Sequence, residues 1–170
     1  TGVVDVGLDT SPTAPTLPTN YTKARRIGSI IRSGGAILAV TQYGDEFYLN
    51  TPVLDVDVLN PGTAAVTRTL ASVPTGVSLM ALLNVKIDND STGDLAWYLS
   101  SLDTVDVAAS ISVAPLGSVL AGNASAGPFG GQVRVWTNTS AQIRSRASAS
   151  GGSDRFAIVT LGWRDRRGRG

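Results

Sequence analysis

Histidine and cysteine are both absent from this chain of 170 residues. Without histidine there is no His-based acid–base catalysis and no Ser-His-Asp or Cys-His nucleophile system. Without cysteine there is no disulfide bond and no thiolate ligand for the common zinc and iron–sulfur sites. These absences remove much of the enzyme repertoire, and we predict that the chain is not an enzyme and uses no cofactor.

Lysine and glutamate are scarce. Lys23 and Lys86 are the only lysines among 14 basic residues, and Glu46 is the only glutamate among 13 acidic residues. Lys and Glu populate solvated helix faces, so their near absence argues against surface helices. Asp, by contrast, suits turns, and 19 Gly and 8 Pro add further turn residues. This composition is typical of an all-β protein.

Strong net charge and long apolar runs are missing as well. The net charge is +1, which creates no global field that would attract nucleic acid or a membrane surface. Apolar stretches such as Val77–Val85 are far shorter than the roughly 20 residues that span a bilayer. The run Arg164–Gly170 carries four Arg against one Asp, and we interpret it as the charged end of a strand. We therefore expect no nucleic-acid partner and no membrane insertion.

Short apolar segments separated by turn residues predict strands along the chain. They are Val3–Leu8, Arg26–Arg32, Ala36–Gln42, Glu46–Leu49, Val53–Leu59, Ala65–Val73, Val77–Asp88, Leu95–Leu102, Val105–Val113, Gly117–Leu120, Gly131–Asn138, Ala141–Ala147 and Phe156–Trp163. Strands of this number and spacing predict an antiparallel β-sandwich with a jelly-roll-like topology.

The first 50 residues differ from the rest. Thr10–Asn20 contains three prolines and can hold neither a helix nor a central strand, so we expect an extended surface connection. Ser33–Gly35 predicts a hairpin loop. Because Pro52 marks a break, we divide the chain into an extended and hairpin segment (1–50) and a β-sandwich domain (51–170). Thr1–Asp9 begins directly in a predicted strand, so we expect that a longer polypeptide precedes it.

A second hairpin is predicted near the C-terminus. Gly131–Asn138 and Ala141–Ala147 lie on either side of Thr139-Ser140, which has the length of a tight connection. Alternation along the two strands turns Val133, Val135 and Ile143 inward. Cross-strand pairing would then gather the outward residues on one exposed face, namely Arg134, Trp136, Arg144 and Arg146.

Aromatic and arginine side chains are the candidates for ligand binding. A partly exposed aromatic ring can bury the apolar face of a sugar, while Arg binds hydroxyls or anionic groups. The alternative is structural, because Trp and Tyr also fill cores and subunit interfaces and Arg is often simply solvated. The candidate ligand-binding residues are Trp136, Arg134, Arg144, Arg146, Trp97 and Tyr98, with Tyr43, Tyr48 and Trp163 as further aromatic candidates.

Two acidic pairs could act as paired carboxylates. Asp55 and Asp57 are two residues apart on one predicted strand, so both would project from one face at roughly 7 Å. That separation suits an inverting glycosidase. Asp45 and Glu46 form the second pair. The alternative is a solvated strand face and a turn.

A cluster of oxygen ligands lies in the loop that begins at Asp88. Asp88, Asp90 and Asp94 are of the type that calcium requires. The loop departs from the EF-hand pattern, because Leu99 stands where the bidentate Glu would be. A polar turn explains the cluster without a metal, and we predict none.

Four stretches of the sequence resemble recurring segments of phage and prophage tail proteins. They read TSPTAPTLPTNYTKARRIGSI, AILAVTQYGDEFYL, QVRVWTNTSAQIRSRAS and TLGWRDRRGR. The resemblance implies a β-sandwich at the distal part of a tail fibre or tail spike. It also implies assembly as a homotrimer, in contact with other virion tail proteins.

The resemblance and the missing catalytic side chains together predict a virion structural protein. It would be a distal tail-fibre domain that binds a host cell-surface receptor, a glycan, as a homotrimer. Such a domain resides in the virion tail and is extracellular once released. Two alternatives remain: a structural connector or capsid-decoration domain with no receptor contact, and a polysaccharide-depolymerising tail spike that uses Asp carboxylates.

Overall fold

The computed structural model describes residues 4–89, 94–110, 112, 118–123 and 128–167. Within these ranges there are eleven strands and no helix, in agreement with the all-β composition. No helix in this part of the chain could therefore cross a membrane. The strands are β1 (Arg32–Ser33), β2 (Ala36–Ile37), β3 (Val40–Tyr43), β4 (Glu46–Leu59), β5 (Val66–Thr69), β6 (Met80–Asp88), β7 (Asp94–Ser100), β8 (Ser118–Asn123), β9 (Phe129–Trp136), β10 (Gln142–Ala147) and β11 (Arg155–Arg164).

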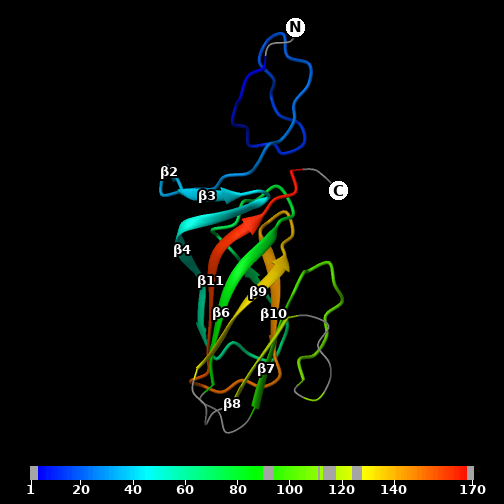
Figure 1. The fold of residues 1–170 in the computed structure, drawn as a ribbon. Helices are drawn as coiled ribbons and strands as arrows, with labels where there is room; N and C mark the ends of the chain where they lie inside the picture. The colour runs from blue at the N-terminus through cyan, green and yellow to red at the C-terminus, as the bar shows by residue number, and fades with distance from the viewer. Residues whose placement is uncertain (1–3, 90–93, 111, 113–117, 124–127, 168–170) are drawn as a thin grey trace.

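Two antiparallel sheets pack against each other, which confirms the predicted β-sandwich (Figure 1). One has the strand order β3-β4-β11-β6-β9 and the other β5-β10-β7-β8, while β1 and β2 form a separate small hairpin. The pairing is nested: β4 pairs with β11, β5 with β10, β6 with β9 and β7 with β8. The four strands β4 to β7 are thus followed in the sequence by their antiparallel partners in reverse order, β8 to β11.

The core lies between the two sheets, where alternation along the strands directs apolar side chains inward. β6 and β11 show it most clearly, since every second residue of β11 from Phe156 to Thr160 is fully buried. Trp97 on β7 stacks on Phe156 of the opposing sheet, with ring centroids 4.6 Å apart. At one end of the core, Phe47 stacks on Trp163. The first stack joins the two sheets, and the second lies within the five-stranded sheet, where Phe47 and Trp163 are register partners.

β4 runs through Pro52, so the boundary predicted near residue 50 falls inside a strand. Opposite β11, Val53 pairs with Thr160 and Tyr48 pairs with Gly162, leaving Leu161 to face all of Leu49–Pro52. Proline is tolerated at such an irregularity because no ladder hydrogen bond is required of its nitrogen. The segment before residue 50 therefore shares a sheet with the segment after it.

The predicted hairpin at Ser33–Gly35 is confirmed, although its strands are only two residues long. Gly34 and Gly35 have φ values of 57° and 83°, as the two central residues of a type I′ turn require. Upstream of it, Arg26–Ile31 was expected to be strand but pairs with no sheet. It is attached to the sandwich instead through Asp165, which accepts hydrogen bonds from Arg26 (2.5 Å) and Ser29 (2.7 Å).

Two further strand predictions are wrong over the residues described. Residues 4–8 of Val3–Leu8 and residues 105–110 and 112 of Val105–Val113 are not strand. Each has the apolar content of a strand but no neighbouring strand to pair with, and strand formation depends on such pairing. Thr10–Asn20, by contrast, contains no helix or strand, as its prolines predict.

The predicted hairpin at Thr139-Ser140 is also wrong, because β9 and β10 belong to different sheets. After β9, the Thr137 N–H donates to the Leu79 carbonyl (2.8 Å), which keeps the chain beside the β6 side of the sandwich. Ala141 then adopts a φ of 55°. Its carbonyl accepts from the Leu70 N–H (2.9 Å), beside β5. The short turn therefore carries the chain from one sheet to the other.

Candidate functional site

The fold separates the six candidate ligand-binding residues into three environments. Arg134 and Trp136 lie on β9, at the edge of the five-stranded sheet, whereas Arg144 and Arg146 lie on β10 of the opposite sheet. All four side chains alternate with buried neighbours, as predicted. The single basic face that cross-strand pairing would have created is nevertheless absent, because these two strands do not pair.

Trp97 and Tyr98 on β7 are buried. Trp97 is 1% exposed and stacked on Phe156, so it cannot act as a platform for a ligand. Tyr98 is 5% exposed, and its hydroxyl donates to the Ser110 carbonyl at 3.3 Å. Both residues were predicted as possible ligand contacts from their chemistry alone. Alternation cannot show that β7 is covered on both faces, because the way the following loop folds back over the strand is a tertiary contact.

A patch of aromatic and charged residues forms at one end of the five-stranded sheet. One row of in-register residues runs across all five strands, and the next row runs parallel to it on the same face. The rows are Tyr43–Glu46–Arg164–Met80–Trp136 and Thr41–Tyr48–Gly162–Leu82–Arg134. We call Tyr43, Glu46, Tyr48, Arg134, Trp136 and the adjoining Arg166 the sheet-end patch.

Arg134 crosses the sheet within this patch. Its Nη1 lies 3.3 Å from Oε1 of Glu46, although β6 and β11 separate the two strands. With strands about 4.8 Å apart, the arginine side chain must extend over Leu82 and Gly162, the residues between them in register. Gly162 has no side chain to obstruct that path.

The aromatic rings of the patch differ in how open they are. The guanidinium carbon of Arg166 lies 5.5 Å from the centre of the Trp136 ring, so a cation–π contact occupies one face of that ring. Tyr43 is 68% exposed and meets the Tyr48 ring edge-on at 6.0 Å. Trp136 was expected to be the exposed ring, but Tyr43 is the more accessible surface for stacking.

Glu46 connects the tyrosines to the arginine. The Tyr48 hydroxyl donates to Oε2 of Glu46 at 2.7 Å, and this hydrogen bond raises the pKa of Tyr48 above its usual value. An exposed ring beside a carboxylate and a guanidinium can bury the apolar face of a sugar and bind its hydroxyl groups. The alternation Glu46-Phe47-Tyr48 was the signal in the sequence that could have grouped Glu46 with Tyr48.

Arg144 and Arg146 hold a long loop against the four-stranded sheet. Arg144 donates to the carbonyl of Thr104 at 2.7 Å, and Arg146 donates to Asp106 at 2.5 Å and to the Thr63 carbonyl at 3.2 Å. Between this loop and the sheet is a cavity of about 450 Å³, which we call the loop hollow. It is lined by Tyr98, Ser100, Asp103, Thr104, Val105, Asp106, Val107, Arg144 and Arg146.

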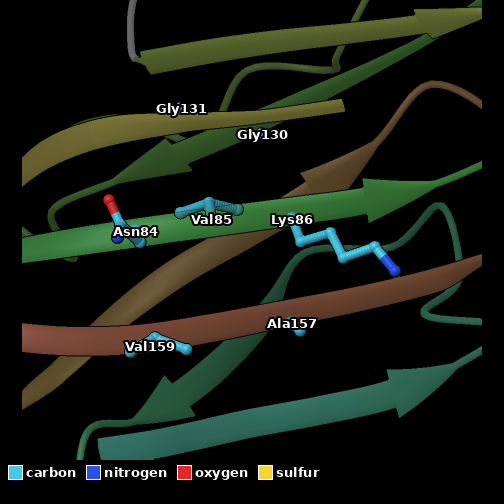
Figure 2. A pocket seen from close by; sticks show the side chains of 7 residues that line it. All are labelled: Asn84, Val85, Lys86, Gly130, Gly131, Ala157 and Val159. Atoms are coloured by element: carbon cyan, nitrogen blue, oxygen red, sulfur yellow. The ribbon is translucent and has the colours of Figure 1, made fainter. Parts of the chain in front are cut away.

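A second depression, of about 350 Å³, lies on the five-stranded sheet (Figure 2). It exists because Gly130 and Gly131 on β9 carry no side chains, and Ala157 and Val159 on β11 add only small apolar ones. Lys86, the one charged residue lining it, is paired with Asp88 at 3.2 Å. The depression is thus an apolar surface feature without a group suited to catalysis.

Asp55 and Asp57 do not form the predicted pair of carboxylates on one face. β4 pairs Val56 with Ile158 and Leu54 with Val159, so Asp55 is an extra residue and its carboxylate turns inward. There it accepts hydrogen bonds from Ser72 and Thr160.

On the outer face, Asp57 forms an ion pair with Arg155. The hydrogen bond that Arg155 donates lowers the pKa of Asp57. The second pair is also divided. Asp45 lies 2.6 Å from Arg167, while Glu46 belongs to the sheet-end patch. None of these carboxylates faces the other member of its predicted pair.

The calcium candidates are not gathered into a site by the described residues. Asp88 is paired with Lys86, Asp94 begins β7, and Asp90 lies outside the described residues. Over the ranges that the structure covers, no group of three or more acidic residues could hold a metal ion.

No family model, curated protein or solved structure matches this chain. In the part of the chain that the structure describes, the sheet-end patch and the loop hollow are the features whose geometry bears on function. They differ in character: the patch is an open face with an exposed ring, and the hollow is a partly open cavity between a tethered loop and the sheet.

Proposed function

We propose that the chain is a virion structural protein, a distal tail-fibre domain that binds a host cell-surface glycan through the sheet-end patch. The observation that carries this proposal is the convergence of Tyr43, Glu46 and Arg134 from three different strands on one exposed face. The resemblance of four stretches of the sequence to phage tail proteins supports the setting. The domain then resides in the virion tail and is extracellular once released.

The nested strand pairing supports a jelly-roll topology for this domain. β4 to β7 run out and β8 to β11 return as their antiparallel partners. Double-sheet jelly rolls are used by viral capsid domains and by lectins. The topology is therefore compatible with a virion protein and with sugar binding, and it favours no catalytic function.

Assembly as a homotrimer, together with other tail proteins, is part of the proposal. The outer face of the five-stranded sheet carries Ala157 and Val159 beside the two glycines of β9, and Leu54 and Leu59 are 54% and 65% exposed. Contact between copies would remove such apolar surface from water. Three copies would also convert weak sugar contacts into avidity.

The test is adsorption of the purified chain to host cells and to arrays of bacterial surface polysaccharides. We expect Tyr43→Ala and Arg134→Ala each to reduce binding at least tenfold, because each removes one side of the sheet-end patch. Tyr21→Ala, outside the patch, is the control and should bind as the parent does. Unchanged binding by both patch variants would contradict the proposal. Light scattering after size exclusion tests the homotrimer, and a monomer at micromolar concentration would count against it.

A structural connector or capsid-decoration domain is the second candidate, since jelly rolls also build capsids. That function predicts no binding to any polysaccharide and a position away from the tail tip in electron micrographs of the virion. The depolymerase alternative has lost its motivating geometry, because Asp55 and Asp57 face opposite ways and Asp45 and Glu46 have separate partners.

A further inference from the structure

We propose that the loop hollow is a second binding site and that it takes a neutral pyranose sugar. This inference deepens the proposed glycan-binding function by adding a site on the opposite sheet and by naming the class of sugar. It depends on the loop after β7, on the charge balance of the cavity and on the chemistry of its walls.

The loop that forms the hollow is long, and its residues 101–110 are held in place. The connection runs from the end of β7 at Ser100 to the start of β8 at Ser118. Loops of this length within a compact domain are often functional. Here Arg144 and Arg146 bind the part that crosses the sheet, through the Thr104 carbonyl and Asp106. The cavity is thereby preformed, as ligand sites usually are.

The charges of the hollow cancel. Two guanidinium groups, Arg144 and Arg146, and two carboxylates, Asp103 and Asp106, line it. Asp106 lies 2.5 Å from Arg146 and 3.9 Å from Arg144. The arginines also donate to the carbonyls of Thr104 and Thr63, so part of their hydrogen-bonding capacity is already used. A site of zero net charge offers an anionic sugar no net electrostatic attraction. It therefore favours a neutral sugar.

The walls of the hollow suit the two surfaces of a pyranose ring. Asp103 and Ser100 line the hollow, and their side-chain oxygens can accept hydrogen bonds from sugar hydroxyls. One carboxylate oxygen of Asp103 also accepts from the Ser101 hydroxyl at 3.4 Å, which leaves the other oxygen for a ligand. Val105 and Val107 form an apolar wall for the C–H face, and Val105 is 85% exposed. A volume of about 450 Å³ falls within the usual range of small-ligand cavities.

The experiment is a titration of the full chain, followed by NMR chemical shifts and saturation transfer. The neutral probes are the methyl glycosides of glucose, galactose and mannose, and the anionic probes are glucuronate and N-acetylneuraminate. We expect at least one neutral probe to bind and both anions to bind at least tenfold more weakly. Asp103→Ala should raise the Kd of the bound neutral sugar at least tenfold.

Two further variants make the result specific. Val105→Ser, at a position too exposed to affect folding, should weaken binding about threefold by removing apolar contact. Asp5→Ala removes an exposed carboxylate from the N-terminal segment and should leave the Kd unchanged. No binding of any neutral probe, binding of glucuronate as tight as that of the neutral sugars, or unchanged affinity in Asp103→Ala would overturn the proposal.

The two proposals fail in different experiments. Tyr43→Ala disrupts the sheet-end patch but should leave titration of the hollow unchanged. If Tyr43→Ala and Arg134→Ala both adsorb to cells as tightly as the parent, glycan binding at the patch is wrong, while the hollow is judged by its own titration. If the hollow binds no sugar but Tyr43→Ala abolishes adsorption, only the second site is wrong.

Discussion

A Cβ atom at Gly162 would lie 2.0 Å from the carbonyl oxygen of Phe47. The backbones of β11 and β4 approach this closely where the register between them shifts, beside Leu161. Phe47 in turn stacks on Trp163, which is fully buried. Glycine at this position therefore lets β4 close over the end of the core, and it also clears the path of Arg134 across the sheet.

Gly162→Ala should destabilise the fold by about 3 kcal/mol or more, since the opposing atoms are backbone and cannot move aside as a side chain could. Urea unfolding followed by tryptophan fluorescence measures the change. Gly152→Ala is the matched control, because a Cβ there meets nothing within 4 Å. The control should stay within about 0.5 kcal/mol of the parent. Equal stability of the two variants would refute the close approach.

Asp165→Asn should lower the free energy of unfolding by about 2–4 kcal/mol, because Asp165 is fully buried and the charge of Arg26 would lose its partner. The same change should release the N-terminal segment, so limited proteolysis ought to cut before β1 much faster. Asp57→Asn, which breaks the exposed pair with Arg155, serves as comparison and should have the smaller effect. If the two variants were equally stable, burial of Asp165 would not be the controlling factor.

Glu46→Gln should lower the pKa of Tyr48, since the hydrogen bond to the Glu46 carboxylate is what raises it. The raised pKa favours the protonated phenol in the folded state. Its contribution to stability is therefore complete below pH 10 and is lost as the pH rises through the folded-state pKa. Absorbance near 295 nm follows the four tyrosines, and Tyr48→Phe identifies the affected one. A titration curve identical in parent and Glu46→Gln would exclude this hydrogen bond in solution.

Trp97→Ala should destabilise the fold by about 3–5 kcal/mol, because it removes a fully buried ring from its stack on Phe156. Trp136→Ala should cost less than half as much, since Trp136 is partly exposed and loses mainly its contact with Arg166. Thermal unfolding of both variants provides the comparison. Similar losses would show that Trp136 is as much a core residue as Trp97.

Local pattern predicted most strands. The alternation from Asn84 to Asp88 appears in β6, and that from Phe156 to Thr160 appears in β11. Beyond Thr160 the register shifts, and Trp163, which strict alternation places on the face opposite Phe156, is buried as well. The pair Gly34-Gly35 was enough to predict the hairpin turn, because a type I′ turn needs two residues that tolerate positive φ. Signals of this kind depend only on neighbours in the chain.

The candidate site was only partly predictable. Arg134 and Trp136 were placed on one outward face correctly, but their companions Glu46, Tyr43 and Arg166 come from other parts of the chain. Arg144 and Arg146 were wrongly joined to them, since the short turn at Thr139-Ser140 changes sheets. The separation of two strands along the sequence does not show whether they will lie side by side in a sheet.

Asp55 illustrates the same limit at the scale of one residue. Strict period-two alternation puts it beside Asp57, yet one extra residue in β4 reverses its side chain. Scarce Lys and Glu and abundant turn residues were enough to determine an all-β chain, because those properties act locally. Strand order, bulges and the residues that meet across the sheets were decided by tertiary packing, because each depends on which distant segments share hydrogen bonds and a core.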